Sequence, residues 1–155
     1  MSKTLPVLAT VMLSACGMLR QAPTRTPTPE TCRSADVATA FVEATSIDEE
    51  FTSIWGRAWE LALTRSAPET VRRSLADLDR LQDKLWGVYY YVAPPCIQHI
   101  VACDLEVMDW DMLALDSLLK GCVECARDAG SRASARDEEC TNALIDFQIS
   151  REQRP

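Results

Sequence analysis

The sequence of 155 residues has little of what usually reveals an enzyme or a nucleic-acid-binding protein. It contains a single histidine, and its 16 Lys and Arg are outnumbered by 23 Asp and Glu. A chain of that charge repels phosphates, so nucleic acid is not an expected partner. Glycine-rich phosphate loops, H-E-x-x-H helices and G-x-S-x-G turns are also missing. No catalytic residue is therefore predicted, and a non-enzymatic protein is favoured over a small enzyme without a recognisable motif.

Long hydrophobic runs are missing as well. The N-terminal apolar segment, Leu5 to Leu19, has only 15 residues and is interrupted by Pro6 and Gly17. Because a helix needs roughly 20 apolar residues to cross a bilayer, a permanent transmembrane helix is not predicted. A cation at Lys3 and small residues just before Cys16 instead give this segment the architecture of an export signal.

The tetrapeptide Leu13-Ser14-Ala15-Cys16 resembles the lipobox of bacterial lipoproteins, a resemblance that covers only about the first 17 residues. It implies a signal peptide over residues 1–15, removed before a Cys16 that carries diacylglycerol and a fatty acid such as palmitate. The protein would then be extracytoplasmic, anchored by lipid to the outer face of the cytoplasmic membrane or to the outer membrane. The alternative is full secretion, with Cys16 incidental.

Residues 16–33 are expected to be the lipid anchor and a linker rich in Pro and Thr. The segment Gln21 to Glu30 has three prolines, three threonines and almost nothing to bury. Extended polyproline geometry, at about 3.1 Å per residue, would let residues 17–30 hold a domain roughly 40 Å from the lipid. Without residues 1–15, 15 Lys and Arg face 23 Asp and Glu, a formal charge of −8, so membrane contact depends on the anchor.

Residues 34–155 are predicted to form one helical domain, because apolar residues recur at intervals of three and four without convincing strand pairs or repeats. The predicted fold is all-α, an antiparallel up-down-up-down four-helix bundle stapled by disulfides. The inward positions expected on its four helices are Ala44, Ile47, Phe51, Ile54, Ala58 and Leu61; Val71, Leu75, Leu78, Leu81, Leu85 and Val88; Val101, Leu105, Met108, Met112, Leu115, Leu119 and Cys122; and Cys140, Leu144 and Phe147.

Capping signals set the expected helix boundaries. Ser66-Ala67-Pro68-Glu69 is a capping signature with proline in the first turn, and Pro94-Pro95 stops the helix that begins there. The third helix is expected to start near Pro95 and to end at Gly130, and Gly121 can kink it. Ser134-x-x-Asp137 is expected to cap a shorter fourth helix.

Six cysteines besides Cys16 are expected to form structural disulfides in an oxidising compartment. They are Cys32, Cys96, Cys103, Cys122, Cys125 and Cys140. Cys125 and Cys140 lie almost symmetrically about a turn expected near 132–133, so they are predicted to pair. Cys32 is expected to reach Cys96 or Cys103. The two cysteines left over lie at opposite ends of the third helix and have no evident partner.

A metal-binding interpretation competes with the disulfides. Cys96, His99 and Cys103 would share one helical face, which suits copper(I) or zinc. The pattern faintly resembles cysteine-rich four-helix copper-binding proteins, although its cysteines are far sparser. Cys122-x-x-Cys125 would be a second metal site or a redox pair, but it is expected near the end of a helix, where thiolates are not stabilised. Structural disulfides are favoured.

Two surface features are candidates for partner binding. An acidic run without Lys or Arg consists of Asp104, Glu106, Asp109, Asp111 and Asp116. It is expected to be mainly a solvated face, with attraction of cations or a basic partner as the alternative. Tyr89, Tyr90 and Tyr91 cannot all face one side of a helix, so exposed rings there are predicted to contact an envelope protein or a glycan. The favoured function is a membrane-tethered binding or scaffold module of the cell envelope.

Overall fold

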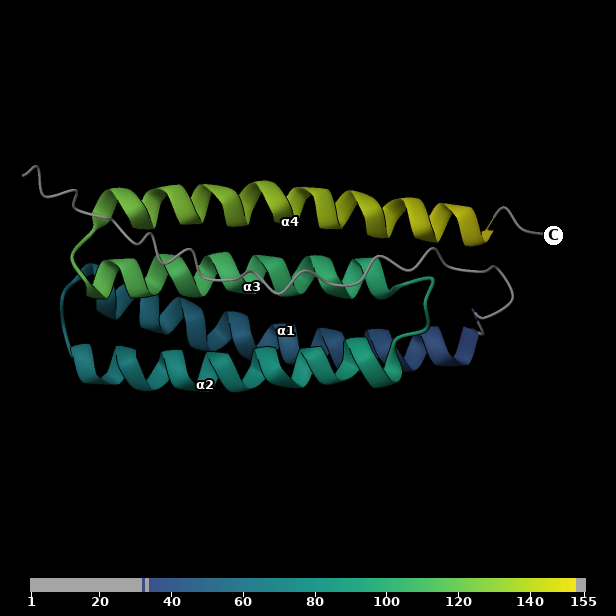
Figure 1. Cartoon of the computed structure of the whole chain (residues 1–155), viewed down its shortest axis with the longest axis horizontal. Coiled ribbons are helices and arrows are strands. Elements are labelled where there is room, and N and C mark those ends of the chain that lie inside the picture. The colour runs from purple at the N-terminus through teal and green to yellow at the C-terminus, as the bar shows by residue number, and fades with distance from the viewer. Residues whose placement is uncertain (1–31, 33, 153–155) are drawn as a thin grey trace, which may run out of the picture.

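A computed structural model describes Cys32 and residues 34–152, and this part of the chain is helical throughout (Figure 1). Its elements are α1 (Ser34–Leu63), α2 (Pro68–Gly87), the π-helical segment η2 (Val88–Val92), α3 (Gln98–Leu119) and α4 (Val123–Glu152). In Figure 1 the four long helices lie side by side, and successive connections lie at opposite ends. The all-α prediction is confirmed for these residues. The predicted signal peptide, Cys16 and nearly all of the linker lie outside them.

The main hydrophobic core is formed by α1, α2, η2 and α3. Its largest fully buried side chains are Leu78, Leu85, Ile97, Leu105, Met108 and Leu115. Within α2 the apolar positions follow the predicted three-four spacing, which places them on one stripe that faces the other two helices. Gln82 is buried among them and donates hydrogen bonds to the Leu105 carbonyl at 3.3 Å and Asp109 Oδ1 at 2.6 Å. Both contacts tie α2 to α3 without leaving the amide group unsatisfied.

α4 packs against α3 through small residues, and its backbone lies apart from that of α1. Ala126, Ala129 and Ala133 of α4 are buried, as are Ala114 and Ser117 of α3. Small side chains let two helix backbones approach closely, whereas the backbones of α1 and α4 do not approach one another. The fourth helix therefore adds to one side of a three-helix core, and a groove stays open along α1.

The turn between α3 and α4 lies at residues 120–122, so the prediction of a third helix that ends at Gly130 is wrong. Gly121 adopts φ +78, a left-handed conformation that glycine takes without strain. The Cys122 N–H bonds the Ser117 carbonyl at 2.9 Å, and the Gly121 N–H bonds the Leu118 carbonyl at 3.0 Å. This pair of bonds is the Schellman ending of an α-helix. The predicted cap at Ser134 and the break at Gly130 both fall inside α4.

Three disulfides join the six cysteines that were expected to pair. Cys32 is bonded to Cys96, Cys103 to Cys140 and Cys122 to Cys125, with Cα–Cα distances of 5.9, 5.6 and 5.3 Å. The predicted Cys125–Cys140 pair is wrong, because the true turn lies about ten residues before the expected one. About that turn, Cys103 and Cys140 are the nearly symmetric pair.

The start of α2 also differs from expectation. Pro68 is in the first turn as predicted, but the N-cap position is Ala67, in a left-handed conformation and without a side-chain cap. Ser66 instead shares a hydrogen bond of 2.7 Å with Thr64. The predicted capping box is therefore wrong, because its serine lies one residue before the cap.

Candidate functional site

A groove runs between α1 and α4, with α3 as its floor. It consists of two adjoining cavities of about 310 and 170 Å³, which share Asp48 of α1 and Asp137 of α4 as lining residues. Its walls are mixed: the hydroxyl side chains of Thr45, Thr52, Ser134 and Thr141 line it together with apolar side chains from all three helices. The apolar lining residues are Phe41, Ala44, Phe51, Ile100, Val107, Met108, Ala133 and Leu144. The Phe41 and Phe147 rings, with centroids 6.1 Å apart, join α1 to α4 near one end.

Four carboxyl groups converge on this groove. Asp104 and Asp111 of α3 are half-buried on its floor, while Asp48 and Asp137 are exposed on its two rims. Asp104 and Asp111 are seven residues apart, two helical turns, so they share one face and lie about 10 Å apart along α3. The groove therefore carries a line of negative charge parallel to the helices.

Burial and repulsion between negative charges raise the pKa values of Asp104, Asp111 and Asp48. Burial raises the pKa of Asp104 to about 7, and the negative charges of Asp48 and Asp137 add to the effect. The pKa of Asp111 rises to about 6 through burial and through the same two charges. Burial, followed by repulsion from Asp137 and Glu49, also raises the pKa of Asp48. Near neutral pH the groove thus holds carboxyl groups that a bound cation would ionise fully.

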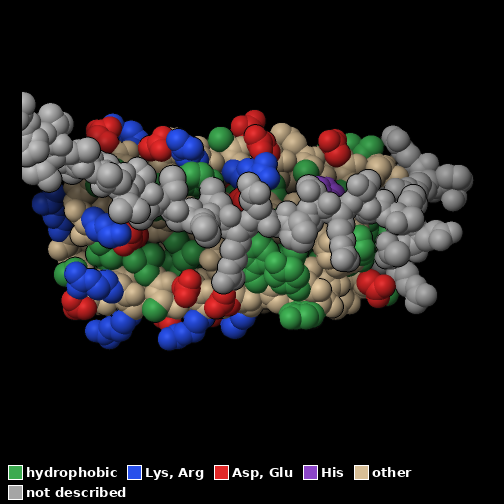
Figure 2. Space-filling view, in the orientation of Figure 1, with side chains coloured by type: hydrophobic (Ala, Val, Ile, Leu, Met, Phe, Trp, Pro, Cys, Tyr) green, Lys and Arg blue, Asp and Glu red, His purple; other side chains and the backbone are tan. Residues whose placement is uncertain are grey.

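Basic side chains near the groove form ion pairs with acidic residues outside it. Arg136 points its Nε to Glu106 Oε2 at 2.7 Å and pairs also with Glu139. On α2 the solvent-facing charges pair with each other, as in Arg72 with Glu69 and in Arg80 with Asp77. Figure 2 shows the resulting mixture of basic and acidic side chains along the lower edge of the molecule. Among the residues for which side chains are described, none forms an ion pair with the four groove carboxylates.

The acidic run found in the sequence is divided by the fold. Asp109 accepts the Gln82 hydrogen bond, Asp116 pairs with Lys120, and Glu106 pairs with Arg136. Only Asp104 and Asp111 face the groove. Asp48 and Asp137 were missed as groove residues, although each begins an Asp-Glu-Glu run, because they come from other helices and nothing in the sequence shows that those runs meet across α3.

The predicted aromatic surface lies at the end of α2 and in η2. Tyr89 is buried, whereas Tyr90 is 54% exposed and Tyr91 is 89% exposed. The Trp86 ring stacks on Tyr90 and meets Tyr89 edge-on, with centroids 5.5 Å apart in each case. One tyrosine thus belongs to the core, and the other two remain candidates for contact with a partner.

The predicted metal trio is held apart by disulfide pairing. Cys96 and Cys103 are bonded to different cysteines, and His99 is exposed on α3. Within the part of the chain that the structure covers, no three His, Cys, Asp or Glu side chains are grouped as metal ligands would be. None of the helices described is long and apolar enough to cross a bilayer.

Comparison with known proteins leaves the groove as the main indication of function, because no family model, no curated protein and no solved structure matches this chain.

Proposed function

We propose that this chain is a lipid-anchored, extracytoplasmic binding module of the cell envelope, and that its acidic groove holds a cationic segment of a partner protein. The bundle, in an up-down-up-down arrangement, acts as a scaffold for this binding, and no chemical step takes place in the groove. The observation that carries the proposal is the convergence of Asp48, Asp104, Asp111 and Asp137 from three helices, with no described basic partner, on one groove of mixed polar and apolar lining.

The shape of the groove favours a ligand with several spaced cations. Lys and Arg side chains combine a long apolar stem with a charged head, so stems fit against the partly exposed Phe41, Val107 and Leu144 while heads reach the carboxylates. A single metal ion needs ligands within about 2–3 Å of one point, whereas these carboxylates are spread along two turns of α3. A basic polypeptide segment therefore matches the groove better than a metal ion does.

Binding of a basic peptide tests the proposal directly. The full-length protein in detergent micelles, titrated calorimetrically with an unstructured peptide of alternating Lys and Ala, is expected to bind it at pH 8 and at least tenfold more weakly at pH 5.5. Protonated Asp104 and Asp111 no longer attract the cations at the lower pH. Raising the salt concentration should also weaken the complex, because partly exposed charges are screened.

Two double variants separate groove binding from general attraction to an acidic protein. Asp104→Asn/Asp111→Asn is expected to weaken peptide binding at pH 8 at least tenfold. Asp77→Asn/Asp79→Asn removes the same charge from the exposed face of α2 and should change binding less than twofold. Equal losses in the two variants would mean that net charge, and not the groove, recruits the peptide. Binding to a neutral glycan but not to the peptide would point to the exposed Tyr90 and Tyr91.

The intact mass of the protein isolated from membranes tests the anchor and the cysteines together. The expected species begins at Cys16, carries diacylglycerol and a fatty acid, and is six hydrogens lighter than the fully reduced chain because three disulfides are present. An unacylated chain that starts at Met1 would contradict the anchor. Six free thiols with bound copper or zinc would instead support the metal-binding alternative built on Cys96, His99 and Cys103.

A further inference from the structure

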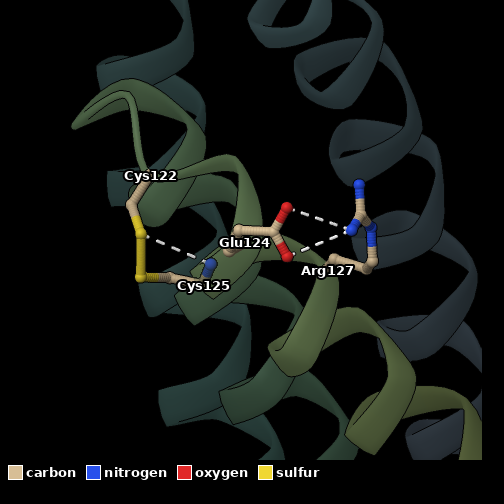
Figure 3. Close-up of polar contacts among 4 residues, drawn as sticks. All are labelled: Cys122, Glu124, Cys125 and Arg127. Carbon is tan, nitrogen blue, oxygen red and sulfur yellow. Dashed lines mark hydrogen bonds and ion pairs between the residues drawn. A yellow bond between two sulfur atoms is a disulfide. The ribbon is translucent and has the colours of Figure 1, made fainter.

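The turn before α4 places a C-x-x-C disulfide at the start of a helix of 30 residues. Cys122 directly precedes α4, and the Cys125 backbone N–H donates a hydrogen bond of 3.3 Å to Cys122 Sγ (Figure 3). Cys125 is exposed and Cys122 is half-buried. In Figure 3 Glu124 and Arg127 pair with each other, at 3.0 Å, on the side away from the two sulfur atoms. The disulfide is therefore open to solvent at one end of the bundle.

The other two disulfides have a bracing role that Cys122–Cys125 does not share. Cys103 and Cys140 are each 4% exposed and connect α3 to α4. Cys32–Cys96 connects the segment before α1 to the segment before α3 across 64 residues. Cys122 and Cys125 are only three residues apart and belong to one turn, so their bond holds no separate elements together. A crosslink that closes so short a loop constrains the unfolded chain least.

The helix start stabilises negative charge on the Cys122 sulfur. The first N–H groups of a helix have no carbonyl partner within the helix and carry partial positive charge, and one of them already points at Cys122 Sγ. A thiolate at such a position is a good leaving group when the disulfide opens and a good nucleophile afterwards. The fold thus distinguishes the two sulfurs: Cys125 is the accessible one, and Cys122 is the one prepared to hold charge.

A cavity of about 330 Å³ lies at the same end of the bundle, lined by the residues that lead into Cys122 and not by the two cysteines themselves. The segment from Leu118 to Gly121, which leads directly into Cys122, forms one wall. Leu61 and Pro68 contribute apolar surface from α1 and α2. An apolar side chain of a polypeptide can lodge there while a neighbouring cysteine of that polypeptide reaches the exposed sulfur.

From this geometry we propose that Cys122–Cys125 is a thiol–disulfide exchange centre that oxidises pairs of cysteines in unfolded polypeptides. A substrate thiolate attacks Cys125 Sγ, the Cys122–Cys125 bond breaks, and Cys122 leaves as a thiolate held by the Cys125 N–H. The second substrate thiolate then attacks the substrate sulfur of the mixed disulfide and releases Cys125. The substrate loses two electrons and two protons and gains a disulfide, and the module becomes a dithiol. Exchange with a low-molecular-weight disulfide restores it.

The test uses the full-length oxidised protein in detergent micelles and a reduced, unstructured peptide with two cysteines. After acid quenching, alkylation and mass analysis, one equivalent of peptide disulfide is expected, with new thiols only at Cys122 and Cys125. The double variant Cys122→Ser/Cys125→Ser should oxidise the peptide at least 100-fold more slowly. Opening of Cys103–Cys140 or Cys32–Cys96 first, or an unchanged rate in the double variant, would overturn the proposal.

Single variants test the assignment of the two sulfurs and stay informative if the double variant does not fold. With iodoacetamide at pH 6, the Cys122 thiol of Cys125→Ser is expected to react at least tenfold faster than the Cys125 thiol of Cys122→Ser. Equal rates would contradict the role of the helix start. The groove variant Asp104→Asn/Asp111→Asn should retain the full exchange rate, so failure of exchange and failure of peptide binding in the groove are distinguishable.

Discussion

Replacing both Cys103 and Cys140 by serine is expected to lower the free energy of unfolding by about 4 kcal/mol and to let α4 separate from α3 before the remaining helices unfold. The bond joins residues 37 apart, and closing a loop of that length removes about 4 kcal/mol of chain entropy from the unfolded state. Two serine hydroxyls in positions that are now 4% exposed would add a desolvation cost.

The separation of α4 is expected because its other attachments are small or partly exposed side chains and one partly exposed ion pair, Arg136 with Glu106. Its buried residues are Cys140 and alanines, each of which removes little apolar area from water, and Leu144 and Phe147 pack against the core of α1, α2, η2 and α3 only from partly buried positions. Arg132 lies over the Trp110 ring at 5.0 Å, an exposed cation–π contact that contributes about 0.5–1 kcal/mol. Without the disulfide, α4 loses its strongest attachment.

Hydrogen exchange and tryptophan fluorescence measure the two parts of this expectation. In the Cys103→Ser/Cys140→Ser variant, amides of α4 should exchange well before those of α2, and denaturant titration should show two transitions. Cys122→Ser/Cys125→Ser is the matched control, because its short loop accounts for at most about 2 kcal/mol and it connects no helices. Equal protection of α2 and α4 in the first variant would mean that the alanine interface alone secures α4.

The helices of the core could be predicted because their stabilisation is periodic along the sequence. Val71, Leu78 and Leu85 are fully buried at intervals of seven residues, two helical turns, in α2. Leu105, Met108 and Leu115 are fully buried at intervals of three and seven in α3. A stripe of large apolar residues fixes which face turns inward regardless of the partner helix. The same signal is weak in α4, where the buried positions are alanines that occur as readily on exposed faces.

The wrong boundary between α3 and α4 shows the limit of local signals. Gly121 and Gly130 both qualify as helix ends, and neither would bring an added side chain into contact with another atom. The helix ends just before Gly121 because the Schellman hydrogen bonds form there and because Ala126 and Ala129 are buried against α3. A third helix that continued to Gly130 would lose both the bonds and this burial. Because the turn was predicted near residues 132–133, Cys125 was expected to pair with Cys140 in place of Cys103.

The groove could be predicted only in part. The sequence shows the acids of α3, but it does not show which of them find partners on α2 or α4. Nor does it show that Asp48 and Asp137, 89 residues apart, face each other across Asp104. The raised pKa values depend on burial and on charges that only the packed helices bring together.

The substitution Asp104→Asn is expected to raise the free energy of unfolding by about 2–3 kcal/mol at pH 8 and to leave it nearly unchanged at pH 4. In the folded state burial raises the pKa of Asp104 from 3.8 to about 7, so the folded protein retains a proton that the unfolded chain releases near pH 4. This contribution to stability is fully present below about pH 4, declines as the pH rises, and is lost above about 7. The upper bound is about 4 kcal/mol, reduced here because Asp104 is only half-buried.

Urea titrations at pH 4.5, 6 and 8 measure this slope, with Asp79→Asn on the exposed face of α2 as the matched control. The native protein should lose stability across that range, and Asp104→Asn should lose distinctly less. A saturating basic peptide should flatten the native slope in the same way, because its cations offset the repulsion among the ionised carboxylates. Stability that instead rises with pH would mean that Asp104 is ionised and paired in the folded protein. In that case a basic group of the protein itself would already neutralise the groove carboxylates, which would contradict binding of a cationic partner there.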